Sequence, residues 1–168
     1  MNITLIGMPG SGKSFVGQKL SEVLRFGFVE PDKILERIHG VVLQGVLEKL
    51  GNEAFLDAEA EVAITESTGK DNLIISPGGS MIYRPRTMNH LSTVSEIVYL
   101  ETSFSVIEKR VGKVPRGIVF NSKTFKELYD QRIPLYEKWA KVRVNGDQLP
   151  EKVISDILLK LNLPESLC

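Results

Sequence analysis

The chain has a single cysteine, Cys168, which is its last residue. One thiol cannot form an internal disulfide, and it cannot supply the paired cysteine ligands of a structural zinc site. The only two histidines, His39 and His90, are far apart in the sequence and show no metal-ligand spacing. We therefore expect neither a disulfide framework nor a metal site built from cysteine or histidine.

Net charge and long apolar runs are also absent. The 21 Lys and Arg residues balance the 21 Asp and Glu residues, which argues against a nucleic acid or an acidic membrane bound through bulk electrostatics. No apolar run approaches the roughly 18 residues that cross a bilayer, and no charged segment followed by an apolar core stands at the N-terminus. We expect a cytoplasmic protein without nucleic-acid or membrane partners.

Short apolar runs alternate along the chain with longer amphipathic segments, and no repeats interrupt them. The predicted strands are residues 2–6, 26–29, 72–76, 96–100 and 142–144. The predicted helices are residues 13–24, 32–38, 41–50, 53–68, 85–91, 104–111, 123–141 and 151–161. Strands that alternate with helices predict a three-layer α/β/α fold with a five-stranded parallel sheet, and a chain of 168 residues is expected to form one domain, residues 1–168.

The strongest motif is GMPGSGKS at residues 7–14, which fits the pattern G-x-x-x-x-G-K-[ST]. It joins a predicted strand to a predicted helix, which disfavours the alternative of a glycine-rich turn that only caps a helix. The glycines let backbone N–H groups turn inward around a phosphate chain, and the helix N-terminus adds partial positive charge. Lys13 can reach the β- and γ-phosphates, and the Ser14 hydroxyl can bind Mg²⁺. The motif predicts ATP and Mg²⁺ as cofactors, with the nucleotide bound by Gly10, Ser11, Gly12, Lys13, Ser14 and Phe15.

Polar or glycine-rich segments follow the other predicted strands. Residues 30–32 (EPD) follow the second strand and residues 77–80 (PGGS) follow the third. The fourth strand leads through a helix to Arg110, and residues 145–147 (NGD) follow the fifth. Because ligands bind beyond the carboxyl ends of parallel strands, we expect these segments to open on one rim.

Together these motifs resemble those of the shikimate kinases, small P-loop kinases built like the nucleoside monophosphate kinases. The family has D-x-D after the second strand, F-R-x-x-E on the substrate helix, G-G-G after the third strand, an arginine before proline in the lid, and R-x-P-L-Y on the long helix. The matching segments read EPD at 30–32, FLDAE at 55–59, PGG at 77–79, VP at 114–115 and RIPLY at 132–136. The resemblance implies the P-loop NTPase fold, with acceptor-binding helices at about 32–67 and a lid at about 112–122.

The resemblance also implies an ATP-dependent kinase that phosphorylates a hydroxyl of a small metabolite, with shikimate as the implied acceptor. Asp32 matches the family acid that orients the acceptor hydroxyl and takes up its proton; the alternative is a helix N-cap. Glu30 replaces an aspartate near Mg²⁺, which it can contact through water; the alternative is a solvated loop acid. Arg110 matches the arginine that stacks on adenine.

Four acceptor-side positions match the family as well. Phe55 is expected to form an apolar wall of the acceptor pocket or, alternatively, part of a helix core. Gly78 and Gly79 let the backbone approach the acceptor, or they only form a turn. Arg132 matches an arginine that binds the substrate carboxylate, with an exposed surface arginine as the alternative.

The acceptor half also departs from the family. Leu56 stands where an arginine helps to grip the substrate carboxylate, and it has no donor. Glu59, which is expected to support that arginine, is left without it, so it is either exposed to solvent or available to a substrate ammonium group. Val114 replaces the lid arginine, and Arg116 is the expected catalytic replacement, with Lys113 as a second candidate.

Three alternative functions follow from these departures. The first is a kinase of the same family for homoserine or another small hydroxy or amino acid, with the carboxylate of homoserine on Arg132 and its ammonium group on Glu59 or Asp57. The second is a catalytically weakened protein that binds ATP without phosphoryl transfer, and the third is a nucleoside monophosphate kinase. For the kinase itself we expect a monomer whose partner is a small-molecule acceptor, a hydroxy acid.

Overall fold

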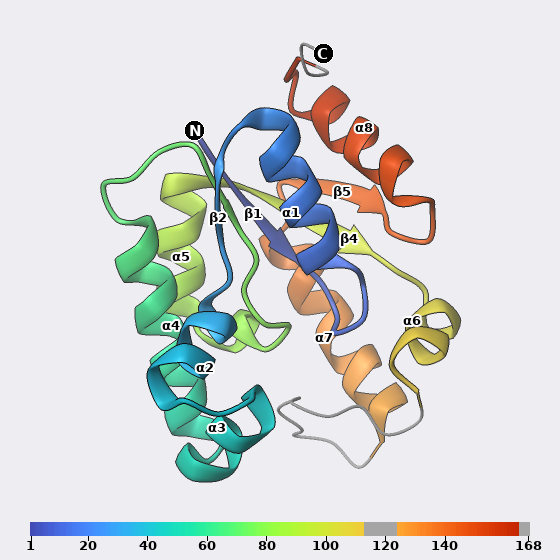
Figure 1. The fold of residues 1–168 in the computed structure, drawn as a ribbon. Coiled ribbons are helices and arrows are strands. Elements are labelled where there is room, and N and C mark those ends of the chain that lie inside the picture. Colours follow the sequence, from blue (N-terminus) through green and yellow to red (C-terminus); the bar gives the residue numbers. More distant parts are fainter. Residues whose placement is uncertain (113–123, 165–168) are drawn as a thin grey trace.

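The computed structural model describes residues 1–112 and 124–164, which form a five-stranded parallel sheet in the order β2-β3-β1-β4-β5 (Figure 1). The strands are β1 Asn2–Ile6, β2 Gly27–Val29, β3 Leu73–Ile75, β4 Ser95–Glu101 and β5 Val142–Asn145. The central strand β1 pairs on both sides, with Ile3 opposite Ile74 of β3 and Glu96 of β4. The predicted fold class is confirmed.

Helices cover both faces of the sheet. They are α1 Lys13–Leu24, α2 Pro31–His39, α3 Leu43–Leu50, α4 Asn52–Ser67, α5 Pro85–Val94, α6 Phe104–Val111, α7 Phe125–Trp139 and α8 Pro150–Lys160. Successive residues of a strand face opposite sides, so Val98 packs in one apolar cluster with α1 and α8, while Ile97 and Tyr99 pack in another with α4, α5 and α7. None of the described helices is long and apolar enough to span a membrane.

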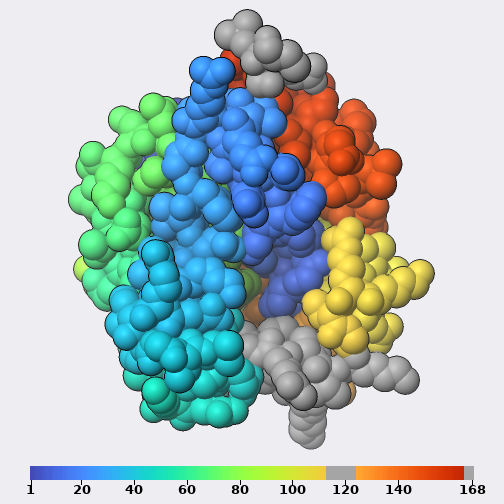
Figure 2. All heavy atoms as spheres, in the orientation of Figure 1, coloured from blue at the N-terminus to red at the C-terminus, as the bar shows by residue number. Residues whose placement is uncertain are grey.

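A third apolar cluster lies away from the sheet, among α2, α3 and α4. Its fully or nearly buried members are Leu35, Val46, Phe55 and Leu56. In the space-filling view, α2 and α3 form a lobe at one end of the molecule (Figure 2). These three helices occupy the stretch expected to bind the acceptor, and they have an apolar core of their own.

The predicted strands and helices are all present, and their ends agree to within a few residues wherever the structure describes them. The expected start of the long helix at residue 123 lies outside the described residues. The described helix α7 begins after Thr124, which forms a capping box with Glu127. A short 3-10 helix, η1 Met81–Tyr83, was not predicted, because three residues are too few to show a periodic pattern.

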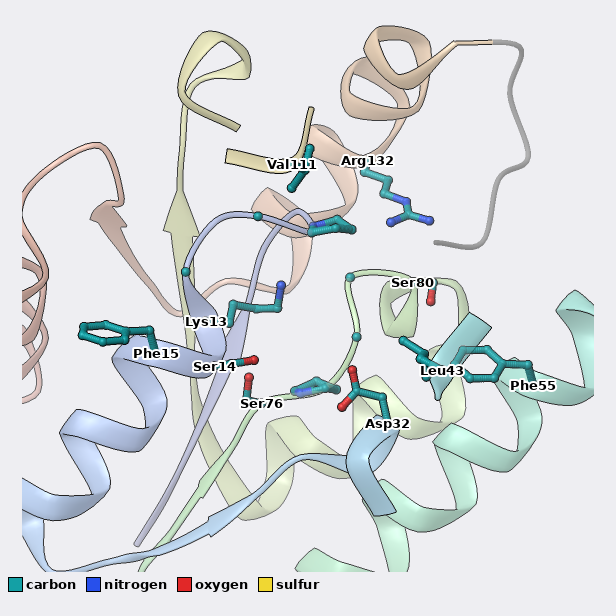
Figure 3. Close-up of a pocket in the computed structure, with 16 residues that line it drawn as sticks. Lys13, Ser14, Phe15, Asp32, Leu43, Phe55, Ser76, Ser80, Val111 and Arg132 are labelled. Atoms are coloured by element: carbon teal, nitrogen blue, oxygen red, sulfur yellow. The ribbon is translucent and has the colours of Figure 1, made fainter. Parts of the chain in front are cut away.

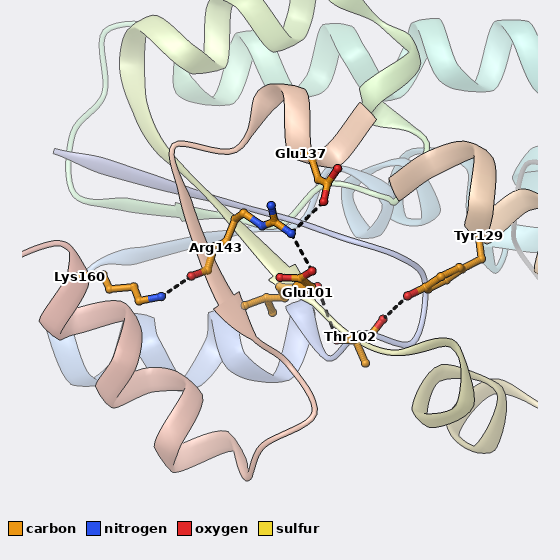
Figure 4. A network of polar contacts seen from close by, with 7 residues as sticks. Glu101, Thr102, Tyr129, Glu137, Arg143 and Lys160 are labelled. Carbon is orange, nitrogen blue, oxygen red and sulfur yellow. Dashed lines mark hydrogen bonds and ion pairs between the residues drawn. The ribbon is translucent and has the colours of Figure 1, made fainter. Parts of the chain in front are cut away.

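A network of polar contacts ties α7, α8 and β4 to the edge strand β5 (Figure 4). Arg143 of β5 forms ion pairs with Glu101 of β4 at 2.7 Å and Glu137 of α7 at 2.8 Å. Lys160 of α8 donates to the Arg143 carbonyl oxygen at 2.6 Å. These contacts help to hold α7 against the sheet.

Candidate active site

A cavity of about 570 Å³ opens beyond the carboxyl ends of β1, β2 and β3 (Figure 3). The phosphate loop and the start of α1 form one side of it, and residues 76–80 form another. Asp32, Phe55 and Arg132 reach it from α2, α4 and α7. Segments far apart in the sequence therefore meet on one rim, as the positions of the strand ends predicted.

The phosphate loop is folded around the amino group of Lys13. This group donates to the carbonyl oxygens of Gly7 at 2.8 Å and Met8 at 3.0 Å. Gly10 and Gly12 have φ angles of 82° and 95°, a region that residues with a Cβ rarely adopt. Burial lowers the pKa of Lys13 to about 8, and Asp32 and Arg132 alter it in opposite directions. The loop thus holds a cation and several backbone N–H groups at the end of the cavity.

A second hollow, of about 320 Å³, lies beside the phosphate loop and is lined by Ser11, Gly12, Phe15, Val16, Arg110, Gly146, Gln148, Pro150 and Val153. Arg110 crosses it and donates to the carbonyl oxygens of Gly10 and Ser11 at 3.3 Å and of Gly146 at 3.4 Å. Phe15 lines both the hollow and the main cavity, and 54% of its surface is exposed. A flat guanidinium group beside an open, partly apolar hollow can stack on a planar base.

Asp32 lies in the first turn of α2 and its carboxylate lines the cavity. Burial raises its pKa, and the nearby charge of Glu30 raises it further. The N-cap of α2 is Glu30 rather than Asp32, so the N-cap alternative for Asp32 is wrong. The Asp32 Oδ1 does accept a hydrogen bond from the backbone N–H of Lys33 in the first turn, at 2.8 Å, and this bond partly offsets the rise in pKa. An acid with a raised pKa in a cavity is suited to accept a proton.

Glu30 does not line this cavity. It borders a separate surface hollow together with Lys33, Glu36, Arg37 and Glu66. The structure therefore places Glu30 near enough to affect the pKa of Asp32 but not in the cavity wall. Any contact of Glu30 with a metal ion stays a prediction. Among the described residues, no three acids, histidines or cysteines gather in a cluster that could hold a metal ion.

Glu59 is completely buried beneath residues 76–80, so the expectation that it is solvent-exposed is wrong. Its Oε1 accepts a hydrogen bond from the backbone N–H of Gly78. A Cβ at position 78 would lie 2.7 Å from that oxygen, so a larger residue there would force the Glu59 carboxylate to shift. Burial, and then the charge of Asp32, raise the pKa of Glu59 to about 7. Within the described chain its Oε2 has no hydrogen-bond partner.

Gly79 is held between the phosphate loop and α7. The Tyr136 hydroxyl donates to the Gly79 carbonyl oxygen at 2.6 Å. A Cβ on Gly79 would lie 2.7 Å from Pro9 and 3.0 Å from both the Gly7 carbonyl oxygen and the Tyr136 hydroxyl. Gly79 therefore does more than form a turn, because it lets the segment after β3 lie directly against the phosphate loop.

Phe55 serves as both an apolar wall and a part of the helix core, because it lines the cavity and packs in the cluster of α2, α3 and α4. Its neighbour Leu56 points into that cluster and does not line the cavity. Asp57 is 70% exposed at its side chain and pairs with Arg84 at 2.9 Å. Neither residue 56 nor residue 57 thus contributes to the cavity wall.

Arg132 is fully buried and lines the cavity, so the alternative of an exposed surface arginine is wrong. Its Nε donates to the Tyr83 hydroxyl at 3.3 Å, and its guanidinium carbon lies 5.3 Å from the centre of the Tyr83 ring. Figure 3 shows the guanidinium extending from α7 into the cavity. A buried guanidinium in this position can bind an anionic group of a ligand.

Several cavity residues were not among the predicted site residues, namely Pro9, Leu43, Ser76, Pro77, Ser80 and Val111. The Ser76 Oγ is buried and has no hydrogen-bond partner in the described residues, and Ser76 lines the same cavity as Ser14 (Figure 3). Ser76 is the last residue of a predicted strand, and that position was a usable signal; Leu43, on a helix of the outer lobe, gave none. The predicted lid residues Lys113, Val114 and Arg116 lie outside the described residues.

Comparisons with known proteins agree with this geometry. A family model described as shikimate kinase matches residues 9–162. Shikimate kinase 1 of Erwinia tasmaniensis is 32% identical over 95% of each chain. Among solved structures, the shikimate kinase of Aquifex aeolicus has a TM-score of 0.82 at 31% identity and 96% coverage of both chains. That of Acinetobacter baumannii, solved in complex with shikimate, has a TM-score of 0.85 at 27% identity, covering 96% of this chain and 93% of its own.

Proposed function

The chain belongs to the shikimate kinase family, and from this premise we propose that its main cavity is where the γ-phosphoryl group of ATP is transferred to a hydroxyl group of shikimate. One observation carries the proposal. A phosphate loop, a carboxylate and a buried guanidinium line the same cavity, as Lys13, Asp32 and Arg132. These three groups match the three requirements of the reaction, which are a phosphate cradle, a proton acceptor and a carboxylate anchor.

The nucleotide occupies the phosphate loop and the hollow beside it. The triphosphate lies against the backbone N–H groups of residues 10–14 and the positive end of α1. The base enters the hollow crossed by Arg110 and bordered by Phe15. Lys13 exchanges its contacts with loop carbonyls for phosphate oxygens, where its charge opposes the negative charge of the transferred group.

Magnesium fits the residues at the base of the phosphate loop. Ser14 and Ser76 both line the cavity, and the buried Ser76 Oγ lacks a hydrogen-bond partner in the described chain. Mg²⁺ usually keeps several of its waters. Ser14 would therefore bind the ion directly, and the Ser76 hydroxyl would accept a hydrogen bond from a water bound to the ion. When bound, the ion supplies charge neutralisation at the phosphates.

The acceptor lies between Asp32 and Arg132, against the apolar side chains of Phe55 and Leu43. Asp32 accepts the proton of the acceptor hydroxyl while the hydroxyl oxygen bonds to the γ-phosphorus. The bond between the γ-phosphorus and the bridging oxygen breaks, and that oxygen leaves with ADP. The raised pKa of Asp32 makes it a stronger base than an exposed aspartate. Arg132 holds the acceptor carboxylate through charge-assisted hydrogen bonds.

Homoserine would need an acid for its ammonium group. Asp57 pairs with Arg84 outside the cavity, and Glu59 lies buried behind Gly78 with one oxygen on that backbone N–H. These placements leave homoserine without an acid in the described cavity wall except Asp32, which is already assigned to the hydroxyl. We also propose that the enzyme acts as a monomer, because the described residues of one chain already bring a phosphate loop, a carboxylate and a guanidinium to the same cavity.

The test is an ADP-release assay with MgATP and a panel of shikimate, homoserine and nucleoside monophosphates. We expect turnover with shikimate alone. Phosphorylation of homoserine or a nucleotide in preference to shikimate would contradict the acceptor assignment. ATP binding by calorimetry without transfer to any member of the panel would instead support the catalytically weakened alternative.

A further inference from the structure

Tyr83 contacts Arg132 from outside the cavity wall. Its hydroxyl accepts a hydrogen bond from Arg132 Nε at 3.3 Å, and its ring lies 5.3 Å from the guanidinium carbon. Arg132 lines the cavity, whereas Tyr83 does not. A tyrosine in this position has no direct contact with a ligand in the cavity, so it can act on the ligand only through the arginine.

The contact restricts the orientation of the guanidinium. A cation over an aromatic face is attracted by the ring, and a hydrogen bond at Nε determines how the planar group is turned. The charge of Arg132 also acts on Tyr136, one helical turn further along α7. With the ring and the hydroxyl of Tyr83 in contact, the guanidinium extends from α7 into the cavity in a defined direction (Figure 3).

Tyr83 is itself held in place by its neighbours. Met81 and Ile82, which precede it in η1, are buried. Arg84, which follows it, donates to the Glu53 carboxylate at 2.8 Å and pairs with Asp57 at 2.9 Å. Helix α4 therefore anchors η1, and η1 in turn positions the ring beside Arg132.

This arrangement matters because one arginine stands alone in the described cavity wall. Arg132 is the single arginine among the described residues that line the cavity, and Leu56 is buried in the apolar cluster of α2, α3 and α4. Recognition of a carboxylate by one guanidinium depends strongly on how that group is oriented, since two aligned donors bind better than one.

We propose that Tyr83 is a positioning residue for the acceptor carboxylate, which it serves by fixing the direction of the Arg132 guanidinium. The inference rests on the proposed function, because it takes the carboxylate of shikimate as the ligand of Arg132. A role through orientation alters the affinity for the acceptor and leaves the affinity for the nucleotide and the chemical step nearly unchanged.

The test compares Tyr83→Phe, which removes the hydroxyl, with Tyr83→Leu, which also removes the ring. We expect the KM and the Kd for shikimate to rise about threefold in the first variant and about tenfold in the second. The KM for ATP and kcat should stay within about twofold of the wild type. Tyr129→Phe is the matched control, because the Tyr129 hydroxyl donates to the Thr102 carbonyl oxygen at 3.1 Å (Figure 4) and its side chain does not line the cavity.

A double-mutant cycle with Arg132→Gln tests whether Tyr83 acts through the arginine. In that background, Tyr83→Leu should change kcat/KM for shikimate by less than about twofold. An equal loss in both backgrounds, equal losses for shikimate and ATP, or an unchanged Kd for shikimate in Tyr83→Leu would overturn the positioning role. Thermal unfolding of each variant shows whether a loss reflects misfolding, and Tyr83→Phe retains the ring if Tyr83→Leu is unstable.

The proposed function and the positioning role fail in different ways. If the wild type binds shikimate without phosphorylating it, the proposed reaction is contradicted, while a higher Kd in the Tyr83 variants still supports the positioning role. If the wild type phosphorylates shikimate and the Tyr83 variants bind it equally well, only the positioning role is overturned. A wild type that does not bind shikimate contradicts both.

Discussion

The nucleotide side and the acceptor side of the cavity are built in different ways. On the nucleotide side, we propose that backbone groups of residues 7–14 make most of the contacts with the phosphates, and β1 and α1 hold the loop at both ends. On the acceptor side, the wall consists of side chains that project from α2, α3, α4 and α7. A backbone cradle needs glycines at fixed positions, whereas a wall of side chains can change one residue at a time.

The difference explains where this chain departs from the family pattern. The phosphate loop fits its motif at every specified position, while the acceptor side has Leu56 in place of an arginine. Leu56 lies in an apolar cluster with Leu35 and Val46, so the substitution is accommodated by packing within the outer lobe. In the proposed site, Arg132 of α7 is thereby left as the carboxylate anchor among the described cavity residues.

The largest effect is expected on the nucleotide side, from Lys13→Met. It removes the cation that lies within the phosphate loop and should lower kcat/KM for ATP by about 10⁴-fold, because both binding and transition-state stabilisation are lost. Steady-state kinetics with saturating shikimate measures this. Lys19→Met, on the exposed face of the same helix, is the control. A loss below about tenfold would contradict the role of Lys13.

A smaller but selective effect is expected from Asp32→Asn at the boundary between the two sides. The amide keeps the shape of the side chain but cannot accept the hydroxyl proton, so kcat should fall about a thousandfold. The Kd for ATP, measured by calorimetry, should stay nearly constant. Asp57→Asn, an acid of α4 that pairs with Arg84 outside the cavity, is the matched control. An unchanged kcat in Asp32→Asn would remove Asp32 from the mechanism.

The two sides also differ in how far their sequences predict them. The strands are buried runs rich in β-branched residues, and the phosphate loop is a local pattern, so both can be recognised without knowledge of the fold. The burial of Glu59 depends on how α4 packs under residues 76–80, which no local pattern encodes. The contact between Tyr83 and Arg132 joins residues 49 positions apart. No local sequence pattern predicts such a contact, so only the structure reveals it.

An arginine restored at position 56 is expected to destabilise the protein without improving its affinity for shikimate. Leu56 is 3% exposed within an apolar cluster, so Leu56→Arg would place a charge there without a partner. We expect the free energy of unfolding to fall by about 3 to 5 kcal/mol, with no improvement in the KM for shikimate. Urea denaturation measures the first quantity and steady-state kinetics the second.

Leu56→Met is the control, because it nearly conserves volume and should cost less than about 1.5 kcal/mol. A stable Leu56→Arg variant that binds shikimate more tightly would show that position 56 can still reach the acceptor. The acceptor side would then be rearranged more easily than its apolar cluster suggests.

The smallest expected effect is a pH dependence of the free energy of unfolding, which comes from Glu59, the buried acid on the acceptor side. Burial raises the pKa of Glu59 from 4.5 to about 7, so the folded protein holds this proton more tightly than the unfolded chain. The resulting stability is fully present below about pH 4.5 and is lost as the pH rises through 7. At pH 8 the difference amounts to about 3 kcal/mol.

Glu59→Gln stays neutral throughout that range, so its stability relative to the wild type should increase between pH 5 and pH 8. Urea denaturation at several pH values measures the trend, and Glu61→Gln, at an exposed position of the same helix, controls for the loss of one negative charge. A difference that stays constant with pH would mean that Glu59 remains ionised beneath Gly78. The unpartnered Oε2 would then need compensation from the nearby positive charges of Lys13 and Arg132, and the two sides of the cavity would be coupled through that acid rather than independent.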